Sequence, residues 1–261
     1  MSPRVALAGY FLIVYAASAA VFVIPISPLY LFPVLVAAAA AAGLGLTAVS
    51  GGRNALRALI ARLKPRRMEL PILAVVLVPP AGVLITLTAL SVSVSPAFAP
   101  GLFLVGLPIG VVAGFLEEIG WTGFAYPHLR VRFGALPAAL LLGILWGLWH
   151  LPVVDSLGAA SPHGLSWAAF FAAFIAVLVP GRCLICWAYD RTQSLLLAQL
   201  MHASSTASLA VLGPQHVTPA QEATWYAAYA ALLWVMVGVP AVLRRARQPG
   251  LSSATLRRQN S

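Results

Sequence analysis

Residues 101–126 read GLFLVGLPIGVVAGFLEEIGWTGFAY, an apolar stretch that contains two adjacent glutamates, Glu117 and Glu118. About 20 apolar residues are enough to cross the hydrocarbon core of a bilayer. A carboxylate at the centre of such a helix costs roughly 2.5–3.5 kcal/mol on insertion scales, and it is found mainly where it faces other polar groups or a wet cavity. The glutamate pair therefore predicts a polar site inside a membrane protein.

The rest of the chain is similarly apolar. Of its 261 residues, 61% are hydrophobic and 8% are charged, and the mean hydropathy is +0.93. Segments of about membrane-spanning length follow one another along the chain: Val5–Ile24, Pro28–Val49, Leu70–Leu90, Gly101–Tyr126, Gly134–Val154, Ser166–Tyr189, Ser194–Leu212 and Thr224–Leu243. We therefore predict an all-α, polytopic membrane protein with about eight transmembrane helices around an intramembrane polar site.

The expected domain organisation is simple. Residues 1–247 form a single transmembrane domain whose functional core covers about 101–212, and the polar tail at 248–261 is expected to be disordered. The first apolar segment resembles a signal peptide, but its apolar run continues to Ile24, so a retained helix is favoured. The basic stretch Arg53–Arg67 is either a short amphipathic helix at the inner membrane surface or a solvated loop.

The basic residues indicate the orientation. The net charge is +10, yet the basic side chains flank apolar segments rather than forming an aromatic-interleaved patch, which argues against nucleic-acid binding. With eight spans and a cytoplasmic amino terminus, all 16 Lys and Arg residues fall on one side, with Arg182 and Arg191 assigned to the inner end of the sixth segment. The pattern predicts a multi-pass protein of a bacterial cytoplasmic membrane with both termini in the cytoplasm.

The ionisable residues assigned to the spans are Glu117 and Glu118 in the fourth, His150 in the fifth and His202 in the seventh. Because each must face a polar group or water, we expect these three helices to converge. Adjacent helix residues point about 100° apart, so one glutamate can face the site while the other bonds to a neighbouring helix. Thr122 lies one turn after Glu118 and could bond to it.

Each histidine has a neighbour on its own helix face. Trp146 precedes His150 by one turn and is suited to packing against its ring, and Thr206 follows His202 by one turn. Counted from the cytoplasmic ends of the segments at 1.5 Å per residue, His150 lies about 24 Å deep and His202 about 12 Å deep. They can meet only if the boundaries shift, the fifth helix tilts, or the fourth and fifth helices extend into the cytosol.

Such a set of side chains can activate water. A glutamate in an apolar cavity can act as a general base, and a histidine can orient the same water or protonate a leaving amine. A second histidine and a hydroxyl can donate hydrogen bonds to a developing oxyanion. The same groups could instead bind a divalent metal such as zinc, although the chain has no His-Glu-x-x-His motif.

These motifs resemble the CPBP family of intramembrane proteases, which contains the CAAX prenyl endopeptidases and the bacteriocin-processing and immunity-type Abi proteins. The resemblance covers Gly114 to Thr206 and rests on three motifs in the expected order, Glu117-Glu118-x-x-x-Thr122, Trp146-x-x-x-His150 and His202-x-x-x-Thr206. Thr122, Trp146 and Thr206 stand where the family pattern has Arg, Phe and Asn. The first replacement removes a charge that could pair with a glutamate.

The resemblance implies an intramembrane endopeptidase that cuts a peptide or protein substrate near the cytoplasmic side, without a cofactor. It implies Glu117 as the general base together with His150, Glu118 as a supporting carboxylate, and His202 with Thr206 on the oxyanion side. A glutamate mechanism is preferred to a metal. For a bacterium, a peptide, a bacteriocin precursor or a membrane protein is expected as substrate rather than a prenylated tail.

Two other functions use the same residues. Intramembrane Glu and His side chains also form proton relays, so a proton-coupled transporter is one alternative, although no internal repeat is evident in the sequence. A non-catalytic immunity or interaction protein is the other, because of the replacements at Thr122 and Thr206.

Overall fold

The computed structural model describes residues 1–22, 24, 28–64, 70–156, 160 and 164–246, and these residues form helices and connecting turns without a strand. The expected disordered tail at 248–261 lies outside the described residues. The α-helices are α1 (Pro3–Ala19), α2 (Pro28–Ala61), α3 (Leu70–Leu73), α4 (Val78–Ser93), α5 (Gly106–Gly120), α6 (Tyr126–Phe133), α7 (Ala135–Trp149), α8 (Leu151–Ser156), α9 (Leu165–Thr192), α10 (Leu195–Leu212) and α11 (Pro219–Ala246). Short helical turns (η1, Ala20–Phe22; η2, Ala74–Leu77; η3, Pro96–Phe98) and a π-helical segment (η4, Trp121–Ala125) connect some of them.

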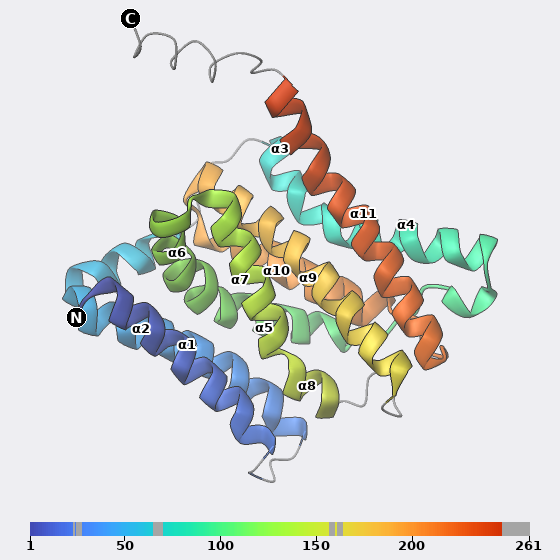
Figure 1. The fold of residues 1–261 in the computed structure, drawn as a ribbon, viewed down its shortest axis with the longest axis horizontal. Coiled ribbons are helices and arrows are strands. Elements are labelled where there is room, and N and C mark those ends of the chain that lie inside the picture. Colours follow the sequence, from blue (N-terminus) through green and yellow to red (C-terminus); the bar gives the residue numbers. More distant parts are fainter. Residues whose placement is uncertain (23, 25–27, 65–69, 157–159, 161–163, 247–261) are drawn as a thin grey trace, which may run out of the picture.

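The helices form an all-α bundle in which α5, α7, α9 and α10 lie at the centre (Figure 1). Helices α1 and α2 pack side by side on one flank, and α4 and α11 lie on the opposite flank. Within the described residues, five helical stretches are long and apolar enough to cross a membrane: Leu31–Ala61, Ala74–Ser93, Ala135–Asp155, Leu165–Thr192 and Leu195–Leu212. The predicted fold class, an all-α polytopic membrane protein, is confirmed, whereas the count of eight spans and the orientation stay predictions.

Helix α2 changes direction within the basic region. Gly52 has a φ of 64° and interrupts the helix, which then continues to Ala61. A positive φ is readily adopted by glycine, which has no Cβ to clash. The sequence allowed either a short amphipathic helix or a solvated loop at Arg53–Arg67. The structure shows a helix in this region as far as Ala61.

Helix α1 packs into the core beside α2. The side chain of Tyr10 on α1 is fully buried, and its ring lies 5.4 Å from that of Trp121.

The close contact between α5 and α10 depends on glycines. A Cβ at Gly110 would lie 2.6 Å from the backbone oxygen of Ala203 and 2.6 Å from the nitrogen of Ala207. Gly114, one turn later, faces the backbone of Gln199 and Ala203 in the same way. Small residues spaced four apart allow membrane helices to approach at backbone contact. This packing brings the end of α5, with its two glutamates, against His202 on α10.

Helices α5 and α6 form one long rod, because the π-helical segment Trp121–Ala125 joins them without a break. Gly134 has a φ of 80° and ends this rod, and α7 then runs back from Ala135. At 1.5 Å per residue, about 24 Å of helix separates Glu117 from Phe133, and about 23 Å separates Ala135 from His150. The return of α7 therefore brings His150 level with Glu117.

Candidate active site

Glu118 lies at the centre of a fully buried polar cluster. It accepts a hydrogen bond from the hydroxyl of Thr122, as the one-turn spacing predicted. Its Oε1 also lies 2.7 Å from Nδ1 of His202, which brings α5 and α10 together through a polar contact. The side chains of Glu118 and His202 are 0% and 1% exposed. Glu118 therefore holds the histidine in place and is closed off from solvent.

Arg182, on α9, completes this cluster and corrects the sequence analysis. Its Nη1 donates to both carboxylate oxygens of Glu118, each at 2.8 Å, and lies 3.2 Å from the hydroxyl of Thr122. The assignment of Arg182 to the charged inner end of its helix was wrong, because its side chain is 0% exposed and lies among the other buried polar groups. Thr122 stands where the family pattern has an arginine that could pair with a glutamate. In this structure Arg182, on α9, supplies that positive charge instead.

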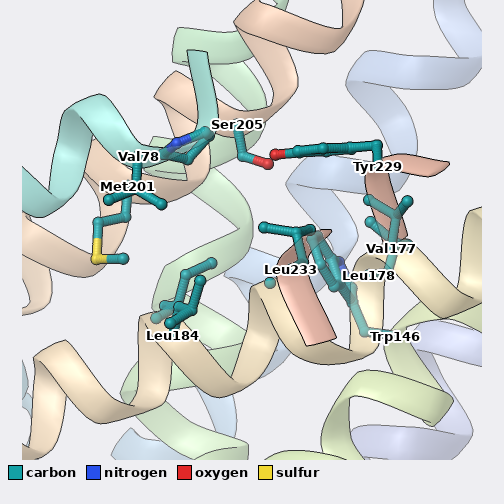
Figure 2. A pocket seen from close by; sticks show the side chains of 12 residues that line it. Val78, Trp146, Val177, Leu178, Leu184, Met201, Ser205, Tyr229 and Leu233 are labelled. Atoms are coloured by element: carbon teal, nitrogen blue, oxygen red, sulfur yellow. The ribbon is translucent and has the colours of Figure 1, made fainter. Parts of the chain in front are cut away.

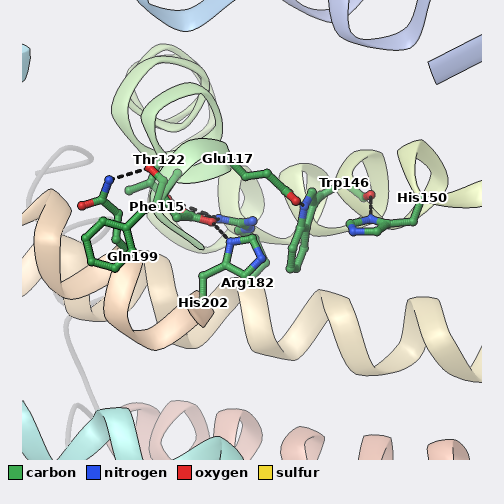
Figure 3. Close-up of polar contacts among 9 residues, drawn as sticks. Phe115, Glu117, Thr122, Trp146, His150, Arg182, Gln199 and His202 are labelled. Carbon is green, nitrogen blue, oxygen red and sulfur yellow. Dashed lines mark hydrogen bonds and ion pairs between the residues drawn. The ribbon is translucent and has the colours of Figure 1, made fainter. Parts of the chain in front are cut away.

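Glu117 points away from this cluster, toward α7 (Figure 3). Its Oε2 accepts a hydrogen bond of 2.8 Å from the indole nitrogen of Trp146, and within the described part of the chain this is its one hydrogen-bond donor. The side chain is buried, at 2% exposure. A carboxylate with a single neutral donor keeps lone pairs for a further partner such as water.

His150 ends α7 and lies on the other side of Trp146 (Figure 3). Its Nδ1 lies 2.7 Å from the backbone oxygen of Trp146, and the two rings meet edge to face with centroids 5.1 Å apart. The contact between Trp146 and His150 was predicted. His150 is half-buried, so it is the most accessible member of the predicted set apart from Thr206. No hydrogen bond joins His150 to Glu117 among the described residues.

His150 and His202 both lie at the site, although they were expected at different depths in the membrane. His202 also contacts Trp146, with ring centroids 4.9 Å apart. The α6–α7 corner is far from the site, whereas only about 11 Å of helix separates Leu195, at the start of α10, from His202. Residues 130–137 of that corner are all exposed, which fits the alternative in which this hairpin extends beyond the turn between α9 and α10.

Thr206 is the one predicted site residue whose side chain makes no hydrogen bond among the described residues. It lies one turn after His202 on α10 and is half-buried. In the described residues, no hydrogen bond joins its hydroxyl to Glu117, Glu118 or His202. The structure therefore brings together Glu117, Glu118, His150 and His202, with Trp146 between the two sides, and leaves Thr206 at the edge.

An apolar path leads to Trp146 from the side of α4 and α11. A groove of about 550 Å³ lies between α7, α9, α10 and the α4 region, and Asp190 and Arg191 lie among its lining residues. A narrower pocket of about 20 Å³ shares Val78, Leu184 and Met201 with the groove and is lined at one side by Trp146 (Figure 2). The groove and the pocket therefore form a continuous apolar surface that reaches the candidate site.

The donor set does not fit a metal site. Glu118 already has a cation, the guanidinium of Arg182, on both of its oxygens, and Trp146 lies between Glu117 and His150. In the part of the chain that the structure describes, no group of three or more His, Cys, Asp or Glu side chains could hold a metal ion. Cys183 and Cys186 are free thiols, both buried.

Comparison with known proteins supports the resemblance seen in the motifs. Residues 99–208 match the family described as type II CAAX prenyl endopeptidase Rce1-like. A curated relative, CAAX prenyl protease 2 of Methanococcus maripaludis, is 29% identical over 118 residues, which cover 42% of this chain and 40% of that protein. The matched part is thus less than half the length of the relative. The family match at residues 99–208 contains every residue of the candidate site.

Proposed function

With residues 99–208 similar to the CAAX protease family, we propose that this protein is an intramembrane endopeptidase in which Glu117 activates the attacking water. The observation that carries the proposal is the unequal bonding of two adjacent glutamates. Glu118 is neutralised by Arg182 and bonded to His202, whereas Glu117 accepts one hydrogen bond, from Trp146. The less bonded carboxylate has lone pairs left to accept a proton.

The proposed reaction is a direct hydrolysis. Glu117 accepts a proton from a water molecule as the oxygen of that water attacks the carbonyl carbon of the peptide bond. His150, on the other side of Trp146, is proposed to orient the water. As the tetrahedral intermediate collapses, the C–N bond breaks and Glu117 passes its proton to the leaving amine. Because Trp146 lies between Glu117 and His150, the proposal requires its side chain to shift when substrate binds, so that one water can contact both residues. Contacts between catalytic groups often tighten only in the substrate complex.

The oxyanion is proposed to form on the side of His202. Because Nδ1–H of His202 donates to Glu118, Nε2 can donate to the developing negative charge only when the ring carries a proton on both nitrogens, and the proposed step uses that form. Thr206 is kept as a second candidate donor, one turn further along α10. Glu118 has the supporting role of holding His202, and no step in the proposed reaction uses a metal.

The apolar groove suggests the class of substrate. An apolar chain could lie in the groove of about 550 Å³, whereas the pocket of about 20 Å³ beside Trp146 has room for about one water molecule. The substrate is therefore proposed to be a peptide or protein with an apolar segment or attachment that lies in the groove. The name of the archaeal relative refers to prenylated CAAX substrates, and a prenyl group is one apolar attachment of this kind. Cleavage near the cytoplasmic side of a bacterial plasma membrane, with both termini inside, is part of the same proposal.

Reconstituted protein tests the proposal. The purified chain in liposomes is given two quenched fluorescent peptides, one ending in a farnesylated Cys followed by three residues and one an unmodified transmembrane peptide. We expect cleavage of at least one by the wild type, cleavage slower by about 10²–10⁴-fold with Glu117→Gln, and no effect of a zinc chelator on the wild type. Equal cleavage by both proteins would contradict the proposal. Proton flux without cleavage of either peptide would favour the transporter alternative.

A further inference from the structure

Arg182 is the one arginine that the structure places in the polar core, and its position needs an explanation. It lies in the apolar sequence of α9, directly after Pro180 and Gly181, and its side chain is 0% exposed. A buried guanidinium carries a large desolvation cost, and such side chains in membrane helices usually mark functional regions. The contacts of Arg182 indicate what its charge does.

Arg182 contacts both sides of the candidate site. On one side, Nη1 bonds to both oxygens of Glu118, the carboxylate that holds His202. On the other side, the guanidinium lies over the ring of Trp146, 4.1 Å from its centroid. An arginine can stack on an indole and donate to a carboxylate at the same time, which a lysine cannot reproduce in full.

We propose that Arg182 is a positioning residue for the peptidase reaction. It keeps Glu118 in the orientation that holds His202, and it packs on the Trp146 ring, which lies between Glu117 and His150. It acts through these residues without contacting the substrate. This inference rests on the proposed peptidase function and adds to it a residue outside the three sequence motifs.

The position of Thr122 offers a way to test this role. The Thr122 hydroxyl lies 3.2 Å from Nη1 of Arg182, so position 122 is next to the place that the charge occupies. Position 122 is also one helical turn from Glu118, a spacing at which an arginine can pair with a carboxylate. Combining Thr122→Arg with Arg182→Ala should therefore keep a positive charge beside Glu118, supplied from position 122 instead of from α9.

The experiment compares four variants in the liposome cleavage assay and measures kcat and KM separately. For Arg182→Met we expect kcat to fall about 100-fold with little change in KM, because a displacement of about 1 Å at a catalytic group costs this much. Arg182→Lys should lose about tenfold, since its ammonium keeps the charge and loses the planar stacking on Trp146. The double variant Thr122→Arg with Arg182→Ala should recover kcat to within about tenfold of the wild type. Thr122→Arg alone should not exceed the wild type.

Several results would overturn the proposal. A folded Arg182→Met protein with the kcat of the wild type would do so, and so would a rise in KM at constant kcat, which indicates substrate binding. If Arg182→Met does not fold, the double variant decides, because a folded and inactive double variant contradicts positioning by charge. If neither folds, an unchanged kcat in Arg182→Lys overturns it. A wild type that cleaves neither peptide rejects the peptidase function, and the positioning role with it.

Discussion

The two sides of the candidate site begin at adjacent residues and have opposite surroundings. On the Glu118 side the carboxylate itself is fully bonded, because it contacts Arg182, His202 and Thr122, all nearly or fully buried. The Glu117 side is sparse, with one indole donor and a half-buried histidine beyond it. A fully paired buried carboxylate gives fixed geometry, whereas a carboxylate with unused lone pairs can accept a proton. The difference supports a structural role for Glu118 and a catalytic role for Glu117.

The largest effect is expected from changing the histidine on the Glu117 side. His150→Ala should reduce kcat by about 10²–10⁴-fold, the range for a lost acid–base group. Its unfolding temperature should fall only modestly. Among the described residues, Nδ1 of His150 bonds to the backbone of its own helix, and the ring packs against Trp146, Trp149 and Phe174. Cleavage kinetics and thermal unfolding in detergent measure the two effects.

A matched control for this variant is His128→Ala. His128 lies on α6 and makes the same kind of bond, from Nδ1 to the backbone oxygen of Phe124 at 2.7 Å. Its loss should leave kcat unchanged. Equal activity losses in the two variants would show that the effect comes from helix packing and would remove the distinction between the two sides.

The histidine on the Glu118 side should behave differently. His202→Gln removes its Nδ1 contact with a buried carboxylate, and a hydrogen bond to a charged group contributes about 1.5–3 kcal/mol. We therefore expect a lower free energy of unfolding together with reduced activity. Unfolding by denaturant, followed through tryptophan fluorescence, measures the free energy of unfolding. An unchanged stability would mean that the Glu118 side is not the structural half.

The packing of α5 against α10 can be disturbed without touching a polar residue. Gly110→Ala places a methyl group 2.6 Å from the Ala203 oxygen, and overpacking of this kind costs about 1–3 kcal/mol. The helices should separate and weaken the contact between Glu118 and His202, with a smaller loss of activity than in His202→Gln. Gly45→Ala is the control, because no atom lies within 4 Å of the added carbon. Equal stability of the two variants would contradict the role of this contact.

The smallest effect is expected at Trp146. Trp146→Phe removes the indole donor to Glu117 and keeps an aromatic ring beneath Arg182 and between the histidines. Because Glu117 does not need this donor in order to accept a proton, kcat should stay within about tenfold of the wild type. A loss as large as that of His150→Ala, measured in the same assay, would show that the indole fixes Glu117 in its catalytic position.

Much of this arrangement could be predicted from the sequence. The apolar segments indicate the all-α membrane fold, and helical spacing alone gives the contacts of Thr122 with Glu118 and of Trp146 with His150. These are local relations between residues one turn apart. The convergence of the glutamates with the two histidines follows from the cost of polar groups in lipid.

Arg182 was missed for an identifiable reason. It was grouped with Arg191 at the end of its helix, although it lies inside the expected span Ser166–Tyr189. An arginine within an apolar span is itself a signal of a buried partner. Which carboxylate it meets could not be predicted, because this depends on the packing of α9 against α7 and α10. The meeting of His150 and His202 likewise depends on the length of α6, which continues the fourth segment to Phe133.

The most direct measurement compares Glu117→Gln with Glu118→Gln in one preparation, recording kcat and the free energy of unfolding for each. Glu117→Gln should lose about 10²–10⁴-fold in kcat and keep the stability of the wild type. Glu118→Gln should lose about 3–5 kcal/mol of stability, because the charge of Arg182 is left buried without its partner. An active Glu117→Gln protein, or equal losses of stability in the two variants, would contradict the division of roles between the two glutamates.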